Sequence, residues 1–130
     1  MKPIIKKSDE KAIRFLMENL SASERTKEMG TLQSELMRAE IVEDDKIPET
    51  VIQMGSYFEV QEISSKKRLR YSLTFPKQAN LAENKLSIFS PIGVALIGFH
   101  QGQEFEWNLP AGMRKFKIEK VSQPTLSSAE

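Results

Sequence analysis

Residues 86–112 of this chain, LSIFSPIGVALIGFHQGQEFEWNLPAG, contain the pattern that decides its fold. They predict a short strand, a Ser-Pro turn and then an apolar helix over residues 92–97. A turn bounded by Gly98 and Gly102 should follow, and then a strictly alternating strand that ends in Pro-Ala-Gly. Because the helix is too short and too apolar for a surface, we expect it to pack against one side of a sheet. The stretch holds no nucleophile–base pair and no cluster of metal ligands, so we interpret it as a binding surface.

Alternation of apolar and polar residues extends this sheet along the second half of the chain. Such alternation is typical of strands with one face on a core and the other face in water. The polar turn at residues 64–67 should join a strand over residues 57–63 to the first alternating segment. The alternating apolar residues are Leu69, Tyr71, Leu73 and Phe75 in that segment, Phe105, Trp107 and Leu109 in the next, and Phe116 and Ile118 in the last.

Residues 8–43 instead have the three- and four-residue spacing of helices. Ser8 should cap a first helix over residues 8–20, and Ser23 should cap a second helix after a short break. We expect a short antiparallel hairpin, a coiled coil, that projects from the sheet; the alternative is that both helices cover the sheet. The apolar stripes are Ile13, Leu16, Met17 and Leu20 in the first helix, and Met29, Leu32, Leu36 and Ala39 in the second.

A boundary is expected after residue 47, because Pro48 biases Ile47 toward an extended backbone. At 130 residues the chain has room for one core with a helical appendage. The predicted fold class is α+β. It has a short N-terminal helical hairpin over residues 1–47, an antiparallel β-sheet domain with one short helix over residues 48–122, and a flexible polar tail over residues 123–130.

The composition excludes several classes of function. The chain has 19 Lys and Arg against 18 Asp and Glu, so it lacks the strongly basic character of duplex-binding proteins. It has no cysteine, and His100 is its one histidine, which excludes a thiolate nucleophile, a Cys-containing zinc site and a histidine-based triad. No run of ~18 apolar residues could cross a membrane. We expect a soluble, cytoplasmic monomer with no cofactor, no metal site and no catalytic residue.

The second half of the chain carries a series of motifs. They are VIQMGS at residues 51–56, YSLTFP at 71–76, LSIFSPIGVALIG at 86–98, Gly102, and LPAG at 109–112. Over residues 48–121 this order resembles the C-terminal domain of the bacterial transcription elongation factors GreA and GreB. It resembles still more closely the Rnk group, which is named for the regulation of nucleoside diphosphate kinase. The resemblance implies an FKBP-like α+β domain that carries an N-terminal antiparallel coiled coil.

The Ser-Pro pair has two interpretations. On physical grounds, Ser90 caps the short helix and Pro91 occupies its first turn, where a missing N–H costs little. The resemblance implies in addition that this corner grips RNA polymerase at the rim of its secondary channel. Gre proteins usually have an acidic residue where this chain has Phe89, so a contact here would depend on apolar area instead of charge. The implied partner-binding residues are Phe89, Ser90, Pro91, Ile92 and Gly93.

The hairpin bears on the choice between binding and catalysis. In Gre factors a long coiled coil carries acidic residues at its tip, and they hold a magnesium ion in the polymerase active centre. The first predicted helix here would span only ~20 Å at ~1.5 Å per residue. Glu18, Glu24 and Glu28 flank a loop that has no acidic pair. We therefore predict a transcription regulator that binds RNA polymerase near its secondary channel, is not an enzyme and does not stimulate transcript cleavage.

Other functions stay open from the sequence. One is transcript-cleavage stimulation of the Gre type, and another is peptidyl-prolyl isomerisation, which would require an open, aromatic-lined pocket. Direct control of nucleoside diphosphate kinase is suggested by the Rnk name alone. The basic residues Lys66, Lys67, Arg68 and Arg70 are interpreted as part of a solvated turn, and no sequence-specific contact with nucleic acid is expected.

Overall fold

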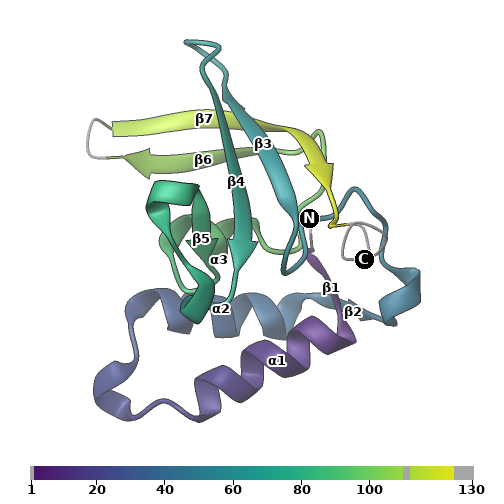
Figure 1. Ribbon diagram of the computed structural model, residues 1–130, viewed down its shortest axis with the longest axis vertical. Coiled ribbons are helices and arrows are strands. Elements are labelled where there is room, and N and C mark those ends of the chain that lie inside the picture. The colour runs from purple at the N-terminus through teal and green to yellow at the C-terminus, as the bar shows by residue number, and fades with distance from the viewer. Residues whose placement is uncertain (1, 110–111, 125–130) are drawn as a thin grey trace.

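Five strands form one sheet in the order β5-β4-β3-β7-β6 in the computed structural model, which describes residues 2–109 and 112–124 (Figure 1). Neighbouring strands run antiparallel, except that β4 and β5 are parallel. The predicted α+β class with a mainly antiparallel sheet is confirmed. The strands are β3 (Tyr57–Glu62), β4 (Arg68–Thr74), β5 (Lys85–Ser87), β6 (Glu104–Leu109) and β7 (Gly112–Ser122).

The inner face of the sheet carries the apolar positions that the alternation predicts. Phe105 and Phe116 stack on neighbouring strands with ring centroids 5.6 Å apart. The register of β3 against β7 shifts after Glu59, and this bulge explains an irregular spacing on β7. Ile118 and Val121 are both buried although three positions separate them, because the bulge turns Val121 back toward the core.

The short helix α3 (Pro91–Leu96) packs under this face, as its apolar sequence predicts. Ile92, Val94 and Leu96 are all buried in the core. The predicted turn after the helix is confirmed, and Gly98 and Gly102 adopt φ values of +85° and +92° that favour glycine. Pro110 and Ala111 of the expected final turn lie outside the described residues.

The two long helices do not project from the sheet domain. Helix α1 (Lys7–Glu18) and helix α2 (Lys27–Arg38) lie along one side of it, and α2 packs against α3 (Figure 1). Ile13 of α1 and Leu32 of α2 have no exposed surface and belong to the same apolar cluster as the sheet residues. The predicted stripes are confirmed, but the projecting arrangement is wrong because these stripes bury themselves against the core.

A pair of short parallel strands closes the base of the hairpin. Strand β1 (Ile4–Lys6) precedes α1, strand β2 (Glu40–Val42) follows α2, and Ile4 lies opposite Glu40. The Ile4 N–H also donates to the Gly98 carbonyl at 3.1 Å, which ties this pair to the end of α3. A side chain at Gly98 would meet Pro3, so the glycine permits this close approach.

Polar contacts near the start of α1 correct the predicted caps. Ser8 is not the cap of α1; its N–H instead donates to Asp44 Oδ1 at 3.0 Å, from a turn 36 residues away. Asp9 is buried and its carboxylate accepts from the Met54 N–H at 3.1 Å. Helix α2 begins after Thr26, not after Ser23, and the Thr26 hydroxyl accepts from the Met29 N–H at 3.3 Å. The contact at the start of α1 therefore depends on the path of the folded chain, whereas the cap of α2 is local.

The expected tail is described only at its first two residues, since residues 125–130 lie outside the described part. Gln123 is anchored: it accepts from the Ser56 hydroxyl at 2.6 Å and donates to the Val51 carbonyl at 3.0 Å. The division of the chain at residue 48 stays a prediction. Within residues 2–109 and 112–124, no helix is long and apolar enough to cross a membrane.

Candidate functional site

The strand-to-helix corner between β5 and α3 is held by hydrogen bonds among closely spaced residues. The Ser90 hydroxyl donates to the Ser87 carbonyl at 2.6 Å and accepts from the Gly93 N–H at 3.1 Å. The Phe89 N–H donates to the Ser87 hydroxyl at 3.0 Å. Pro91 is the first residue of α3, so the predicted Ser90 cap and Pro91 position are confirmed. These bonds fix the backbone on both sides of the Ser-Pro pair.

Exposure divides the five predicted partner-binding residues into two groups. Pro91 is exposed, and Phe89 and Ser90 are partly exposed. Ile92 is only 4% exposed and Gly93 is buried, so neither offers a side chain to a partner. A Cβ at Gly93 would collide with the Ser87 carbonyl oxygen. Ile92 and Gly93 therefore anchor the corner, and a direct contact can come from the other three residues.

The corner carries no charge. Residues 86–99 include no Asp, Glu, Lys, Arg or His. Phe89 packs against the core and is only partly exposed, whereas Pro91 is exposed. A partner would therefore meet apolar area and a few backbone and hydroxyl groups, on a surface that needs little ordering.

The tip of the hairpin is built in a different way. Residues 22–24 form a single 3-10 turn between α1 and α2. The Ser21 N–H and the Ser21 hydroxyl both donate to Glu24 Oε1 at 2.9 Å. These hydrogen bonds lower the pKa of the Glu24 carboxyl. The carboxylate nearest the tip thus serves as a cap for its own turn.

The other acidic residues near the tip do not converge with Glu24 on one point. Glu18 ends α1, whereas Glu28 lies in the first turn of α2. Among the residues that the structure describes, no group of three or more His, Asp or Glu side chains is placed to hold a metal ion. His100 lies in the turn before β6 and pairs as an isolated bridge with Val51.

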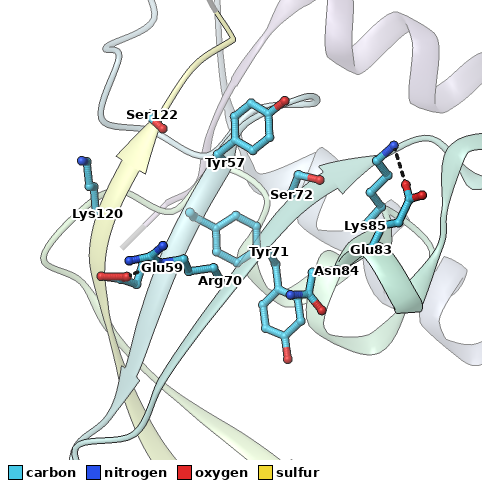
Figure 2. Close-up of a pocket in the computed structure, with 11 residues that line it drawn as sticks. Tyr57, Glu59, Arg70, Tyr71, Ser72, Glu83, Asn84, Lys85, Lys120 and Ser122 are labelled. Carbon is cyan, nitrogen blue, oxygen red and sulfur yellow. Dashed lines mark hydrogen bonds and ion pairs between the residues drawn. The ribbon is translucent and has the colours of Figure 1, made fainter.

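A second surface feature, which the sequence did not predict, lies on the outer face of the sheet. It is an open hollow of about 500 Å³ over β3, β4, β5 and β7, with Tyr57 standing in it (Figure 2). Alternation along each strand shows which side chains point outward, but only the strand order brings Tyr57, Arg70 and Lys120 together. Arg68 and Arg70 of the predicted basic turn belong to β4.

The chain matches the family model described as the C-terminal domain of the transcription elongation factors GreA and GreB, over residues 47–123. GreA of Syntrophus aciditrophicus is 33% identical over 87 residues, which is 67% of this chain and 54% of that protein. GreA of Clostridium acetobutylicum is 32% identical over 90 residues, which is 69% of this chain and 57% of that protein. The chain therefore spans little more than half the length of these curated relatives.

Solved structures extend the similarity to the helical part. A structure described as a prokaryotic transcription elongation factor GreA/GreB from Nitrosomonas europaea has a TM-score of 0.80 and 34% identity. The alignment covers 94% of this chain and 98% of that one. Gfh1 of Thermus aquaticus has a TM-score of 0.55 at 21% identity, over 93% of this chain and 98% of that one, which is a likeness of fold.

Proposed function

This chain belongs to the GreA/GreB family of transcription elongation factors, and we propose that it binds RNA polymerase near its secondary channel without stimulating transcript cleavage. The observation that supports this proposal is the difference between the corner and the tip. The corner presents Pro91 on a fixed backbone, whereas the Glu24 carboxylate at the tip caps its own turn. In this proposal the chain is a binding protein, active in the cytoplasm as a monomer, and not itself an enzyme.

Phe89, Ser90 and Pro91 would make the contact with the polymerase. Ile92 and Gly93 would support it from below, because both are buried. The absence of charge over residues 86–99 means that screening by salt should weaken this contact little. A hydrogen-bonded corner also loses little conformational freedom when it is bound, which favours affinity from a small area.

The hairpin limits what the chain could do once bound. Helix α1 has 12 residues, which corresponds to a length of ~18 Å at ~1.5 Å per residue. The β1–β2 pair closes the base of the hairpin, and the α2 stripe is packed against the core, so the tip does not extend as a free arm. We place the chain with the Rnk group on this ground, since a short hairpin distinguishes that group from GreA and GreB.

A charge introduced at the corner tests the binding site. Pro91→Glu should weaken binding to core RNA polymerase at least about tenfold, because an uncharged contact would bury an unpaired carboxylate. The fold should be retained, since glutamate is favourable in the first turn of a helix. Pro76→Glu is the matched control, because Pro76 is also exposed and also begins a short helical turn. Equal affinity of the two variants, or no binding by the unmodified chain at micromolar concentration, would contradict the proposal.

Transcript-cleavage stimulation of the Gre type is the alternative function. The relatives are named transcription elongation factor GreA, and this name is compatible with such an activity. The construction of the tip is the observation that disfavours it, because a magnesium ion normally requires carboxylates that converge beside substrate phosphates. Release of short RNA fragments from stalled elongation complexes separates the two functions.

A further inference from the structure

The outer face of the sheet places an exposed tyrosine in a row of small residues. Tyr57 of β3 lies opposite Ser72 of β4 on one side and Ser122 of β7 on the other. Neither serine is large enough to cover an aromatic ring, and Tyr57 remains 56% exposed. Lys85 of β5 continues the same row beyond Ser72. The ring therefore forms an open platform within the hollow of about 500 Å³ (Figure 2).

Cations flank this platform on both sides. In the next row, Glu59 lies between Arg70 of β4 and Lys120 of β7. The Arg70 side chain is 83% exposed, and Lys120 is also exposed. Lys120 lies opposite Glu59, but Glu59 is bound to Arg70. Among the described residues, Lys120 itself forms no ion pair within 4 Å. Glu59 binds Arg70 through Nε, so Lys120 and the rest of the exposed Arg70 guanidinium remain available to a ligand that lies across Tyr57.

The acidic residues that line the hollow are already paired. Glu59 is largely covered and binds Arg70 at 2.8 Å and Arg68 at 3.7 Å. The hydrogen bond from Arg70 is the main reason why the pKa of Glu59 is lowered. Glu83 pairs with Lys85 at 3.0 Å. Among the charged residues that line the hollow, three cations, Arg70, Lys85 and Lys120, outnumber two carboxylates, Glu59 and Glu83.

We propose that this face binds single-stranded nucleic acid without sequence preference, with a base stacked on Tyr57 and phosphates bound by Arg70 and Lys120. An aromatic ring in a positively charged groove is the arrangement by which sheet surfaces hold unpaired strands. A duplex does not fit, because its bases are already stacked and the chain carries a net charge of only +1. An acidic peptide would use the cations but would gain little from the ring.

This site is separate from the corner in the proposed function. Phe89, Ser90 and Pro91 belong to the β5–α3 connection, whereas Tyr57 points from the face turned away from the core. The inference therefore does not depend on polymerase binding. A variant at one site should leave the other unchanged, so failure of either proposal can be recognised separately.

Fluorescence anisotropy with the full chain tests the inference. The probe is a labelled mixed-sequence oligonucleotide of about ten nucleotides, within the ~4–16-nucleotide range of small sheet-surface sites. It is prepared as single-stranded RNA, as single-stranded DNA and as a duplex. We expect both single strands to bind more tightly than the duplex. The ratio of the affinities for single-stranded RNA and single-stranded DNA identifies which of the two is the preferred ligand.

Substitutions at two residues locate the site. Tyr57→Ala should weaken binding about tenfold, whereas Tyr57→Phe should retain it, because the stacking surface is kept. Lys120→Ala should reduce the slope of log affinity against log salt by about 0.7, the value expected for one lost phosphate contact on a single strand. The matched controls are Phe15→Ala, an aromatic residue of α1 that is 65% exposed, and Lys27→Ala, an exposed lysine at the start of α2.

Three results would overturn the inference. The first is no salt-dependent binding of either single strand by the unmodified chain. The second is an equal loss of affinity in Tyr57→Ala and Phe15→Ala, which would place the strand elsewhere. The third is tighter binding of an oligoglutamate peptide than of both strands, unaffected by Tyr57→Ala, which would assign the face to an acidic polypeptide. Circular dichroism of each variant establishes that it remains folded.

Discussion

The β5–α3 corner and the hairpin tip are both capped turns, yet they differ in what supports them. At the corner, the Ser90 hydroxyl caps α3, and the turn rests on buried Ile88, Ile92 and Gly93. At the tip, Ser21 and Glu24 cap each other, and residues 21–27 are all exposed. Similar capping chemistry can therefore produce a corner that is fixed on the core or a turn that is held only by its own residues, depending on the packing behind it.

The largest effects should come from the packing that places the hairpin against the core. Leu32→Ala should lower the free energy of unfolding by about 3 kcal/mol, because Leu32 has no exposed surface and its removal leaves a cavity. Met37→Ala, on the same helix but 74% exposed, should change it by less than about 0.5 kcal/mol. Urea unfolding measures both values. Equal small effects in the two variants would mean that α2 is not part of the core and that the hairpin is not held against it.

A pair of glycine substitutions examines the support under the corner. Gly93→Ala should destabilise the chain by about 2 kcal/mol, because the new Cβ would collide with the Ser87 carbonyl in a packed region. Gly30→Ala in α2 should instead stabilise the chain by up to about 1 kcal/mol. Outside the neighbouring backbone of the helix, no atom lies within 4 Å of the position that the new Cβ would take, and alanine has a higher helix propensity than glycine. Thermal and urea unfolding of both variants provide the check. A stable Gly93→Ala protein would show that the corner can relax.

The two capping serines offer a more direct comparison. Ser90→Ala should lower the free energy of unfolding by about 1 kcal/mol, the usual value for a lost helix cap. Ser21→Ala should cost only a few tenths of a kcal/mol, because its partners at the tip are open to water. The two unfolding curves should therefore separate clearly. Equal costs would indicate that the tip is as firmly supported as the corner.

The smallest expected effect is a pH dependence at Asp9, which joins α1 to the sheet. Burial raises the pKa of Asp9, while the Met54 N–H and Lys6 oppose that shift. The folded state therefore holds the proton more tightly, so wild-type stability falls as the pH rises from the ordinary value of 3.8 through the raised pKa. The Asp9→Asn variant should not show this fall. Between pH 3.8 and the raised pKa, the stability of the variant relative to the wild-type chain should therefore increase as the pH rises. Urea unfolding of the two proteins at several pH values measures the difference, and a constant difference would contradict it.

Much of the fold could be predicted because its signals are local. The alternation of apolar and polar residues predicted the strands, and the short apolar run with Ser90 and Pro91 predicted α3 and its cap. The stripes through Ile13 and Leu32 correctly identified the buried sides of α1 and α2. A stripe shows that a helix buries one face, but not which element covers that face. For this reason the predicted projection of the hairpin from the sheet was wrong.

The remaining features depend on contacts between distant residues. Strands β1 and β2 have three residues each, which is too short for alternation to be visible. The Ser8–Asp44 hydrogen bond replaces a local cap with one from 36 positions away. In the corner, the sequence correctly placed Pro91 in the first turn of α3, but it could not show that Ile92 is buried in the core. The juxtaposition of Tyr57 with Lys120 follows from strand order and register, which alternation does not determine.

Binding to RNA polymerase and the absence of cleavage can be followed together in one mixture with a stalled elongation complex. The chain is added to stalled RNA polymerase that holds a labelled transcript, with Pro91→Glu and Pro76→Glu as the variant and its control. We predict that the unmodified chain and Pro76→Glu remain bound to the complex, that Pro91→Glu does not, and that no short RNA is released. Release of short RNA fragments would show that the chain stimulates cleavage, and retention of Pro91→Glu on the complex would show that the corner is not the binding site.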